Sequence, residues 1–129
     1  MRTPILIALV AALTLPAASS AKREMLSDEA RLEKALTGLT PGKPVSCIDL
    51  RDTQGTEAIG DTLIFRRSRN FIYRNDAPGC GGRFNEAFIT RTFDNRLCRG
   101  DVVSRADLTS GFESGFCIAG SFTPYRAPK

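Results

Sequence analysis

The sequence predicts a mainly β fold (α+β by one N-terminal helix), with a small curved antiparallel sheet or barrel that disulfides stabilise. Three observations lead to this prediction: an apolar leader at the start of the chain, four cysteines after it, and short β-type segments separated by turn residues. The 129 residues carry a net charge of +4 and include no histidine. Because catalytic triads and general bases at neutral pH usually rely on an imidazole, the composition argues against an enzyme.

Residues 1–21 have the features of a secretory signal peptide. Arg2 supplies their only charge, residues 5–15 form an apolar run, and small residues follow Pro16 as far as Ala21. An apolar run of this length is too short to cross the roughly 30 Å hydrocarbon core of a bilayer as a helix. We therefore expect cleavage after Ala21, a periplasmic or secreted location, and no transmembrane segment in the mature chain.

The chain that follows the leader is long enough for one compact domain with one hydrophobic core. We divide it into an N-terminal tail and helix, residues 22–43, and a disulfide-stabilised β domain, residues 44–129. It contains 17 basic and 14 acidic residues, so the mature domain remains weakly basic.

The helix is predicted from its capping residues and its apolar spacing. Ser27 can cap the N-terminus, and Asp28 and Glu29 place two carboxylates in the first turn, where the helix dipole is positive. Gly38 and Pro41 then end the helix. The apolar positions between these signals follow a period close to 3.6 residues and are Ala30, Leu32, Ala35, Leu36 and Leu39.

From residue 44 onward, runs rich in Ile, Val, Phe, Tyr and Thr alternate with Gly, Asn, Asp and Pro clusters, a pattern typical of antiparallel β structure. Arg67-Ser68-Arg69 is predicted as a hairpin turn, and residues 77–82 as a loop that is held in place if Cys80 is bonded. We expect the helix to pack against the sheet or to cover one edge. The predicted strands are residues 45–50, 62–66, 70–74, 87–93, 101–104 and 116–123.

The four cysteines are Cys47, Cys80, Cys98 and Cys117. An even number of cysteines in a short exported domain is typical of a disulfide framework, with three possible pairings. They lie 33, 18 and 19 residues apart, so the close pairs of a structural zinc site are missing, and we expect neither a metal nor another cofactor. Because Cys47 and Cys117 occupy β-type segments near the two ends of the domain, we predict nested pairs, Cys47–Cys117 and Cys80–Cys98.

Three motifs carry a resemblance to a known family. They are Pro41-Gly42-x-Pro44-x-x-Cys47-Ile48, Leu97-Cys98-x-Gly100-Asp101 and Gly115-x-Cys117-Ile118-x-Gly120-x-Phe122-x-Pro124-Tyr125. Through them, residues 36–125 resemble a family of small exported proteins from alphaproteobacteria, the sphingomonads especially, known only as a domain of unknown function. The resemblance implies a Gram-negative periplasmic or secreted setting and adds no catalytic residue.

Arginine usage gives the leading functional prediction. Thirteen of the 17 basic residues after residue 21 are arginine, and residues 65–74 interleave them with aromatic side chains. The guanidinium fork binds phosphate and carboxylate groups, and aromatic rings can stack on sugars. We predict an exposed patch that binds an anionic envelope glycan or lipid headgroup, and no nucleic acid; the alternative is a solvated hairpin face without a ligand. The patch residues are Arg66, Arg67, Arg69, Tyr73 and Arg74.

The leading prediction is therefore a non-catalytic exported domain with a binding or structural role at the bacterial cell envelope. The first alternative is a small protein inhibitor of a secreted enzyme, which presents residues 75–82 to a periplasmic protein as a rigid loop. The second is a histidine-free hydrolase, which needs a concave pocket with two facing carboxylates, one with a raised pKa. Its candidate carboxylates, for which turn and capping roles are the simpler expectation, are Asp49, Asp52, Asp61, Asp101 and Asp107.

Overall fold

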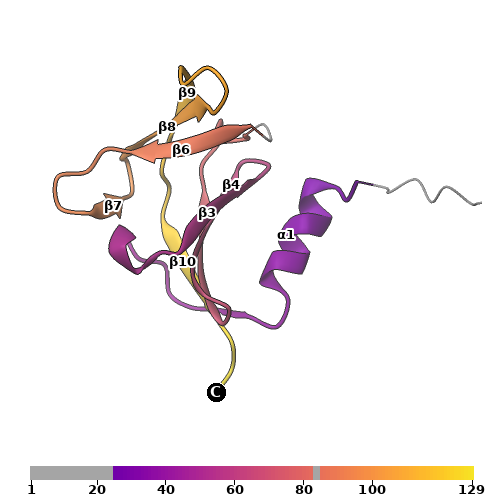
Figure 1. Ribbon diagram of the computed structural model, residues 1–129. Coiled ribbons are helices and arrows are strands. Elements are labelled where there is room, and N and C mark those ends of the chain that lie inside the picture. The colour runs from indigo at the N-terminus through magenta and orange to yellow at the C-terminus, as the bar shows by residue number, and fades with distance from the viewer. Residues whose placement is uncertain (1–24, 83–84) are drawn as a thin grey trace, which may run out of the picture.

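The computed structural model describes residues 25–82 and 85–129, and it confirms a mainly β fold with one helix (Figure 1). The predicted signal peptide, residues 1–21, lies outside the described residues. In chain order the elements are α1 (Asp28–Leu36), β1 (Thr40–Pro41), β2 (Cys47–Asp49), the 3₁₀ helix η1 (Leu50–Asp52), β3 (Gly55–Ile59), β4 (Thr62–Ser68), β5 (Phe71–Asp76), β6 (Glu86–Thr90), β7 (Arg96–Cys98), β8 (Val102–Asp107), β9 (Glu113–Ile118) and β10 (Phe122–Arg126).

The largest sheet has five antiparallel strands in the order β1-β10-β5-β4-β3. The predicted hairpin between β4 and β5 is present, but β4 continues to Ser68 and the turn falls at residues 69–70. The pairing register shifts between Arg66 and Ser68, which makes Arg67 an extra residue on its strand. This β-bulge places the turn later than the sequence suggested.

The other strands form a three-stranded sheet, β6-β8-β9, and a two-stranded sheet, β2-β7. The sheets are antiparallel and do not close into a barrel. In Figure 1 the three-stranded sheet lies above the five-stranded one, and α1 stands on the right. The predicted strand 116–123 is in fact two strands, because β9 belongs to the three-stranded sheet and β10 to the five-stranded sheet.

Gly120 lies between β9 and β10, where the chain passes from the three-stranded sheet to the five-stranded sheet, and its lack of a side chain makes this passage possible. A Cβ atom at this position would stand 2.5 Å from the carbonyl oxygen of Asp76, too close for any residue with a side chain. The side-chain amide of Asn75 pairs with the same glycine, donating to its carbonyl and accepting from its N–H, both at 2.8 Å. The chain can therefore pass directly from one sheet to the other while its buried polar groups remain hydrogen-bonded.

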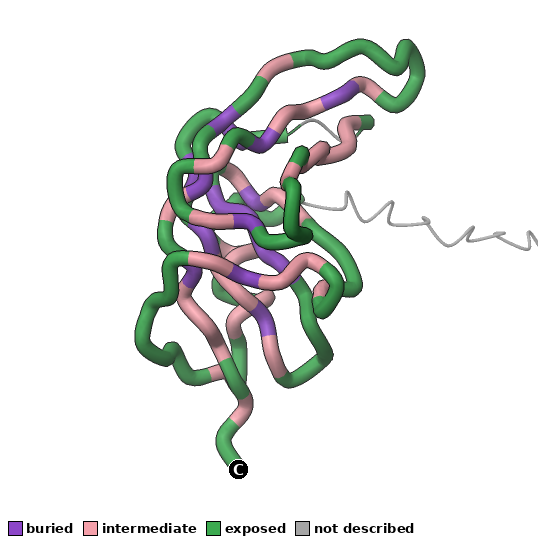
Figure 2. The backbone as a smooth tube through the Cα atoms, turned by 90° about the vertical axis from the view of Figure 1, so that its left-hand side faces the viewer, coloured by how far each residue is buried: buried purple, intermediate pink, exposed green. Residues whose placement is uncertain are grey.

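The five-stranded sheet is covered on both faces, so four consecutive residues of β4, Thr62 to Phe65, are buried. Figure 2 shows the buried stretches in the interior of the fold and exposed stretches along its outer loops. On one face Leu63 and Phe65 join the main core, which also receives side chains from β2, β7, β8, β9 and β10. On the other face Ile59, Ile64 and Ile72 form a second core beneath the helix. The partly buried apolar side chains that complete this second core are Leu32, Ala35, Leu36, Leu39 and Tyr125.

The helix forms and docks as the sequence predicted. Ser27 Oγ accepts a hydrogen bond from the Ala30 N–H at 3.2 Å, and the helix ends at Leu36, two residues before Gly38. Gly38 adopts a φ of +76°, a conformation that glycine tolerates and that ends helices. Within residues 25–82 and 85–129, no helix is long and apolar enough to cross a membrane.

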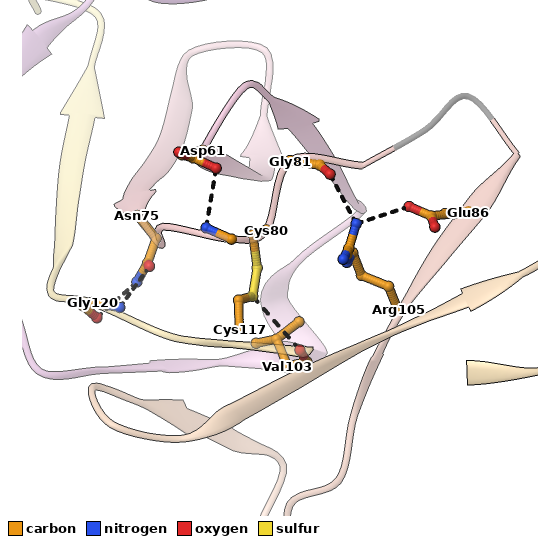
Figure 3. The surroundings of a disulfide bond; sticks show 10 residues. Asp61, Asn75, Cys80, Gly81, Glu86, Val103, Arg105, Cys117 and Gly120 are labelled. Atoms are coloured by element: carbon orange, nitrogen blue, oxygen red, sulfur yellow. Dashed lines mark hydrogen bonds and ion pairs between the residues drawn. A yellow bond between two sulfur atoms is a disulfide. The ribbon is translucent and has the colours of Figure 1, made fainter. Parts of the chain in front are cut away.

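The predicted nested disulfides are wrong: the bonds join Cys47 to Cys98 and Cys80 to Cys117. Cys47 and Cys98 are directly opposed on the paired strands β2 and β7, with Cα atoms 4.0 Å apart. The second bond links the loop that follows β5 to β9, with Cα atoms 5.2 Å apart (Figure 3). Pairing depends on which segments become neighbours, and a cysteine's distance from the ends of the domain does not determine this.

Candidate functional site

The register of the β4–β5 hairpin divides the five residues of the predicted patch between the two faces of the sheet. Phe65 is opposite Tyr73, whereas Ile64 is opposite Arg74 and Arg66 is opposite Ile72. Because opposed residues share a face and neighbouring residues alternate, Arg66 and Arg74 lie on the helix side with Ile64 and Ile72. Tyr73 lies on the other side, so the predicted residues do not form one continuous surface.

The two arginines on the helix side are engaged in ion pairs within the protein. Arg66 contacts the Glu57 carboxylate at 3.1 Å, and Arg31 of α1 approaches the same carboxylate at 3.6 Å. Arg74 Nε pairs with Asp76 at 3.0 Å. Burial opposes the charged form of Arg74, but the hydrogen bonds and charges of Asp76 and Tyr125 together outweigh it and raise the pKa of Arg74. Arg66 therefore helps to connect the strands to the helix, whereas Arg74 is held by a residue of its own strand, and neither belongs to the candidate site.

On the opposite face, two guanidinium groups lie over one aromatic ring. The guanidinium carbon of Arg67 is 5.3 Å from the centre of the Phe71 ring, and that of Arg126 is 4.2 Å from it. Tyr73 packs against the same ring at 4.8 Å with an interplanar angle of 52°. We call Arg67, Phe71, Tyr73 and Arg126 the arginine–aromatic cluster. Its geometry follows from the fold, because β10 places Arg126 directly opposite Phe71 on β5.

The arginine–aromatic cluster carries an excess of positive charge. Arg67 is paired with Asp52 of η1 at 3.0 Å. Arg126 is exposed, as is Arg69 in the adjacent turn, and neither makes an ion pair with any residue in the described part of the chain. Cation–π contacts orient guanidinium groups and leave their edge N–H donors free for an oxyanion. This end of the sheet can therefore receive phosphate or carboxylate groups.

Sequence reasoning missed Phe71 and Arg126. Phe71 belongs to the same aromatic and arginine run as the predicted residues, and its alternation with Tyr73 was the available signal. Tyr125-Arg126 repeats the same residue types at the end of the chain. No local pattern indicates that this last strand pairs with β5, so the proximity of Arg126 to Phe71 was not readable.

The loop proposed for an enzyme inhibitor is held firmly. Asp61 Oδ1 accepts a hydrogen bond from the Gly79 N–H at 3.1 Å, and Cys80 is fully buried in its disulfide (Figure 3). As predicted, residues 77–82 form a loop that the bonded Cys80 fixes. Only small residues, including Pro78 and Gly79, are exposed at its tip, which gives a partner enzyme little to bind.

The five aspartates considered for a hydrolase all have structural partners. Asp107, as predicted, caps a local turn, and Asp52 holds Arg67 in the cluster described above. The partners are Arg51 for Asp49, Arg67 for Asp52, the Gly79 N–H for Asp61, the Cys98 N–H for Asp101, and the Thr109 and Ser110 N–H groups for Asp107.

Two of these carboxyl groups have clearly shifted pKa values, and both shifts are downward. Hydrogen bonds from the Arg51 side chain and backbone lower the pKa of Asp49 to about 2. Backbone hydrogen bonds from Ser110 and Thr109 lower the pKa of Asp107. A general acid needs the opposite shift, so these two groups are unsuited to protonate a leaving group near neutral pH.

The four cysteines are all in disulfides, so none of them has a free thiol that could act as a nucleophile. Among the described side chains, no three of His, Cys, Asp and Glu lie close enough together to hold a metal ion.

No family model, curated protein or solved structure matches the chain. The resemblance to exported alphaproteobacterial proteins therefore stays a prediction, and the geometry of the arginine–aromatic cluster has to carry the functional argument.

Proposed function

We propose that this protein is a non-catalytic exported domain that binds an anionic glycan of the cell envelope through the arginine–aromatic cluster. The observation that carries the proposal is the position of Arg67 and Arg126 over the Phe71 ring, with Asp52 as their one carboxylate partner among the described residues. Ring contact orients the two guanidinium groups, and their remaining donors suit phosphate or carboxylate oxygens.

The compartment supports this choice of ligand. Two disulfides are typical of proteins outside the reducing cytoplasm. We also propose that residues 1–21 are removed as a signal peptide and that the mature domain is released into the periplasm or the medium. The polyanions in those spaces are envelope glycans, whose sugar rings can also stack on a partly exposed aromatic side chain such as Tyr73.

The test is retention of the oxidised mature domain, residues 22–129, on immobilised lipopolysaccharide, with a parallel column of carboxylated peptidoglycan fragments. In the double variant R67Q/R126Q we expect the affinity to fall at least tenfold, because each charge-assisted hydrogen bond contributes about 1.5–3 kcal/mol. The wild-type affinity should also fall as salt is raised, since exposed charges are screened.

The matched control is R99Q/R96Q, which removes the same charge from two exposed arginines outside the cluster. This variant should retain its affinity within about twofold. Equal losses in both double variants would show that net charge alone retains the protein, and the cluster would no longer be a binding site. Vesicles of an anionic phospholipid serve as a third arm, and preferential binding to them would replace the glycan by a lipid headgroup.

A further inference from the structure

The two arginines of the arginine–aromatic cluster are not equivalent, because only one of them has a carboxylate partner. Arg67 pairs with Asp52 at 3.0 Å, and both side chains are about half exposed. Arg126 lies closer to the Phe71 ring, at 4.2 Å from its centre, and makes no ion pair within the described part of the chain. The cluster therefore presents an uncompensated guanidinium group on one side and a nearly neutral Asp52–Arg67 pair on the other.

Asp52 is held beside the cluster by a short segment with several hydrogen bonds. It is the last residue of η1, whose first residue, Leu50, donates its N–H to the Asn95 carbonyl at 2.8 Å. Thr53 donates two hydrogen bonds to the Leu50 carbonyl, from its N–H at 3.2 Å and from its hydroxyl at 2.8 Å. The backbone of Asp52 is thus fixed before any ligand arrives, which reduces the ordering cost of binding.

The Asp52 carboxylate retains a free acceptor. Its Oδ2 contacts Arg67, whereas Oδ1 accepts no hydrogen bond from any other residue in the described part of the chain. An ionised carboxylate only accepts hydrogen bonds, and a guanidinium group only donates them. The pair therefore offers an acceptor beside a donor, and a hydroxyl group, which can both donate and accept, matches the two together.

A ligand that carries only ionised acid groups cannot use this acceptor. Its oxygens can accept from Arg126 and Arg67, but the Asp52 carboxylate repels them. A sugar with one acid group and free hydroxyls avoids this repulsion, because its acid can meet Arg126 while a hydroxyl donates to Asp52. Both guanidinium carbons lie within 5.3 Å of the centre of the Phe71 ring, so neighbouring groups of one short glycan can contact both arginines.

We propose that the arginine–aromatic cluster selects acidic sugars with free hydroxyl groups, and that Asp52 is the residue that determines this specificity. The acid group of the sugar pairs with Arg126. A hydroxyl donates to Asp52 Oδ1 and accepts from Arg67, and the sugar ring packs against Tyr73. This choice of ligand class rests on the proposed function, because both use the same site.

The probes are two acidic oligomers of equal length: tetragalacturonate, which carries hydroxyl groups, and end-blocked tetraglutamate, which carries none. Isothermal titration calorimetry measures their affinities for the oxidised mature domain. We expect the wild type to bind tetragalacturonate at least about tenfold more tightly than tetraglutamate. Asp52→Ala should weaken tetragalacturonate binding at least about fivefold, because a charge-assisted hydrogen bond is lost, and it should leave tetraglutamate binding unchanged or tighter.

The sign of the change separates this role of Asp52 from an effect of net charge. Asp52→Ala removes a negative charge, so attraction between charges alone would tighten the binding of both probes. The matched control is Glu113→Ala, which also removes the carboxylate of an exposed ion pair, with Arg91 at 2.6 Å, outside the cluster. This control should change both affinities by less than about twofold, since exposed charges at a distance are screened.

Three results would overturn the proposal. They are no saturable binding of tetragalacturonate by the wild type at about 1 mM, a wild-type preference for tetraglutamate, and equal changes of both affinities in Asp52→Ala. Equal losses would show that Asp52 only positions Arg67. The double variant R67Q/R126Q keeps the result separable from the proposed function. If this variant loses lipopolysaccharide affinity while Asp52→Ala affects the two probes alike, the cluster is an anion site without selectivity for sugars.

Discussion

At the scale of single residues, short polar contacts fix the points where the chain changes direction. Asn75 is fully buried, yet its amide satisfies both backbone groups of Gly120. Asp61 accepts a hydrogen bond from the Gly79 N–H in an exposed loop, and Asp101 caps the turn after β7 through the Cys98 N–H at 2.7 Å. Because buried polar groups that lack partners are destabilising, the buried Asn75 contributes more to the fold than its small size suggests.

The first prediction concerns Asn75. Replacement by alanine leaves the N–H and C=O of Gly120 without partners in a partly buried position, so we expect the free energy of unfolding to fall by about 2 kcal/mol. Chemical denaturation measures the difference. The control is Asn70→Ala in the exposed turn, which should change stability by less than about 0.5 kcal/mol. Similar losses of stability in both variants would show that the hydrogen bonds between Asn75 and Gly120 contribute no more to the free energy of unfolding than an exposed turn residue does.

The second prediction concerns the pH dependence of Asp49. Hydrogen bonds from Arg51 lower the pKa of this carboxyl from its usual 3.8 to about 2 in the folded state. Because the folded pKa is the lower one, the stabilisation is complete above pH 3.8 and is lost as the pH falls toward 2. Carboxyl ¹³C NMR should show a midpoint near pH 2, and Arg51→Gln should move it toward 3.8. A wild-type midpoint near 3.8 would contradict the ion pair.

At the scale of elements, the strongest local signals were confirmed and the weaker ones were missed. The helix, with its cap and apolar stripe, and the strands β4 and β5 follow directly from capping and alternation. β3 was missed because glycine and glutamate dilute its pattern, and β7 because three residues are too few to show one. Both strands exist because a neighbour supplies the hydrogen bonds, and that neighbour is visible only in the folded chain.

At the scale of the whole molecule, the two disulfides have different roles. The Cys47–Cys98 bond joins two three-residue strands, a pair too short to be stable in isolation. The Cys80–Cys117 bond lies in the main core, with both cysteines buried, and connects the loop after β5 to the three-stranded sheet. The first bond therefore secures a local element, and the second holds two sheets together.

The third prediction compares the loss of each bond. Loops of 51 and 37 residues give about 4 kcal/mol for each bond in the chain-entropy account, so loop length alone predicts nearly equal losses. We expect C80A/C117A to lose about 1–2 kcal/mol more than C47A/C98A in guanidinium denaturation, because it also removes buried core atoms. Equal stabilities would contradict this difference. Non-reducing tryptic mapping of the wild type provides the control, and it should give peptides joined as Cys47–Cys98 and Cys80–Cys117.

The sequence by itself determined the fold class, the position and capping of the helix, most strands and the presence of disulfides. Each of these features depends on residues close together in the chain, where periodicity, turn residues and caps act directly. The tertiary structure alone decided which cysteines pair, which face each arginine occupies and that Arg126 meets Phe71. Those outcomes depend on which strands become neighbours, and long-range packing decides that adjacency without leaving a local pattern in the sequence.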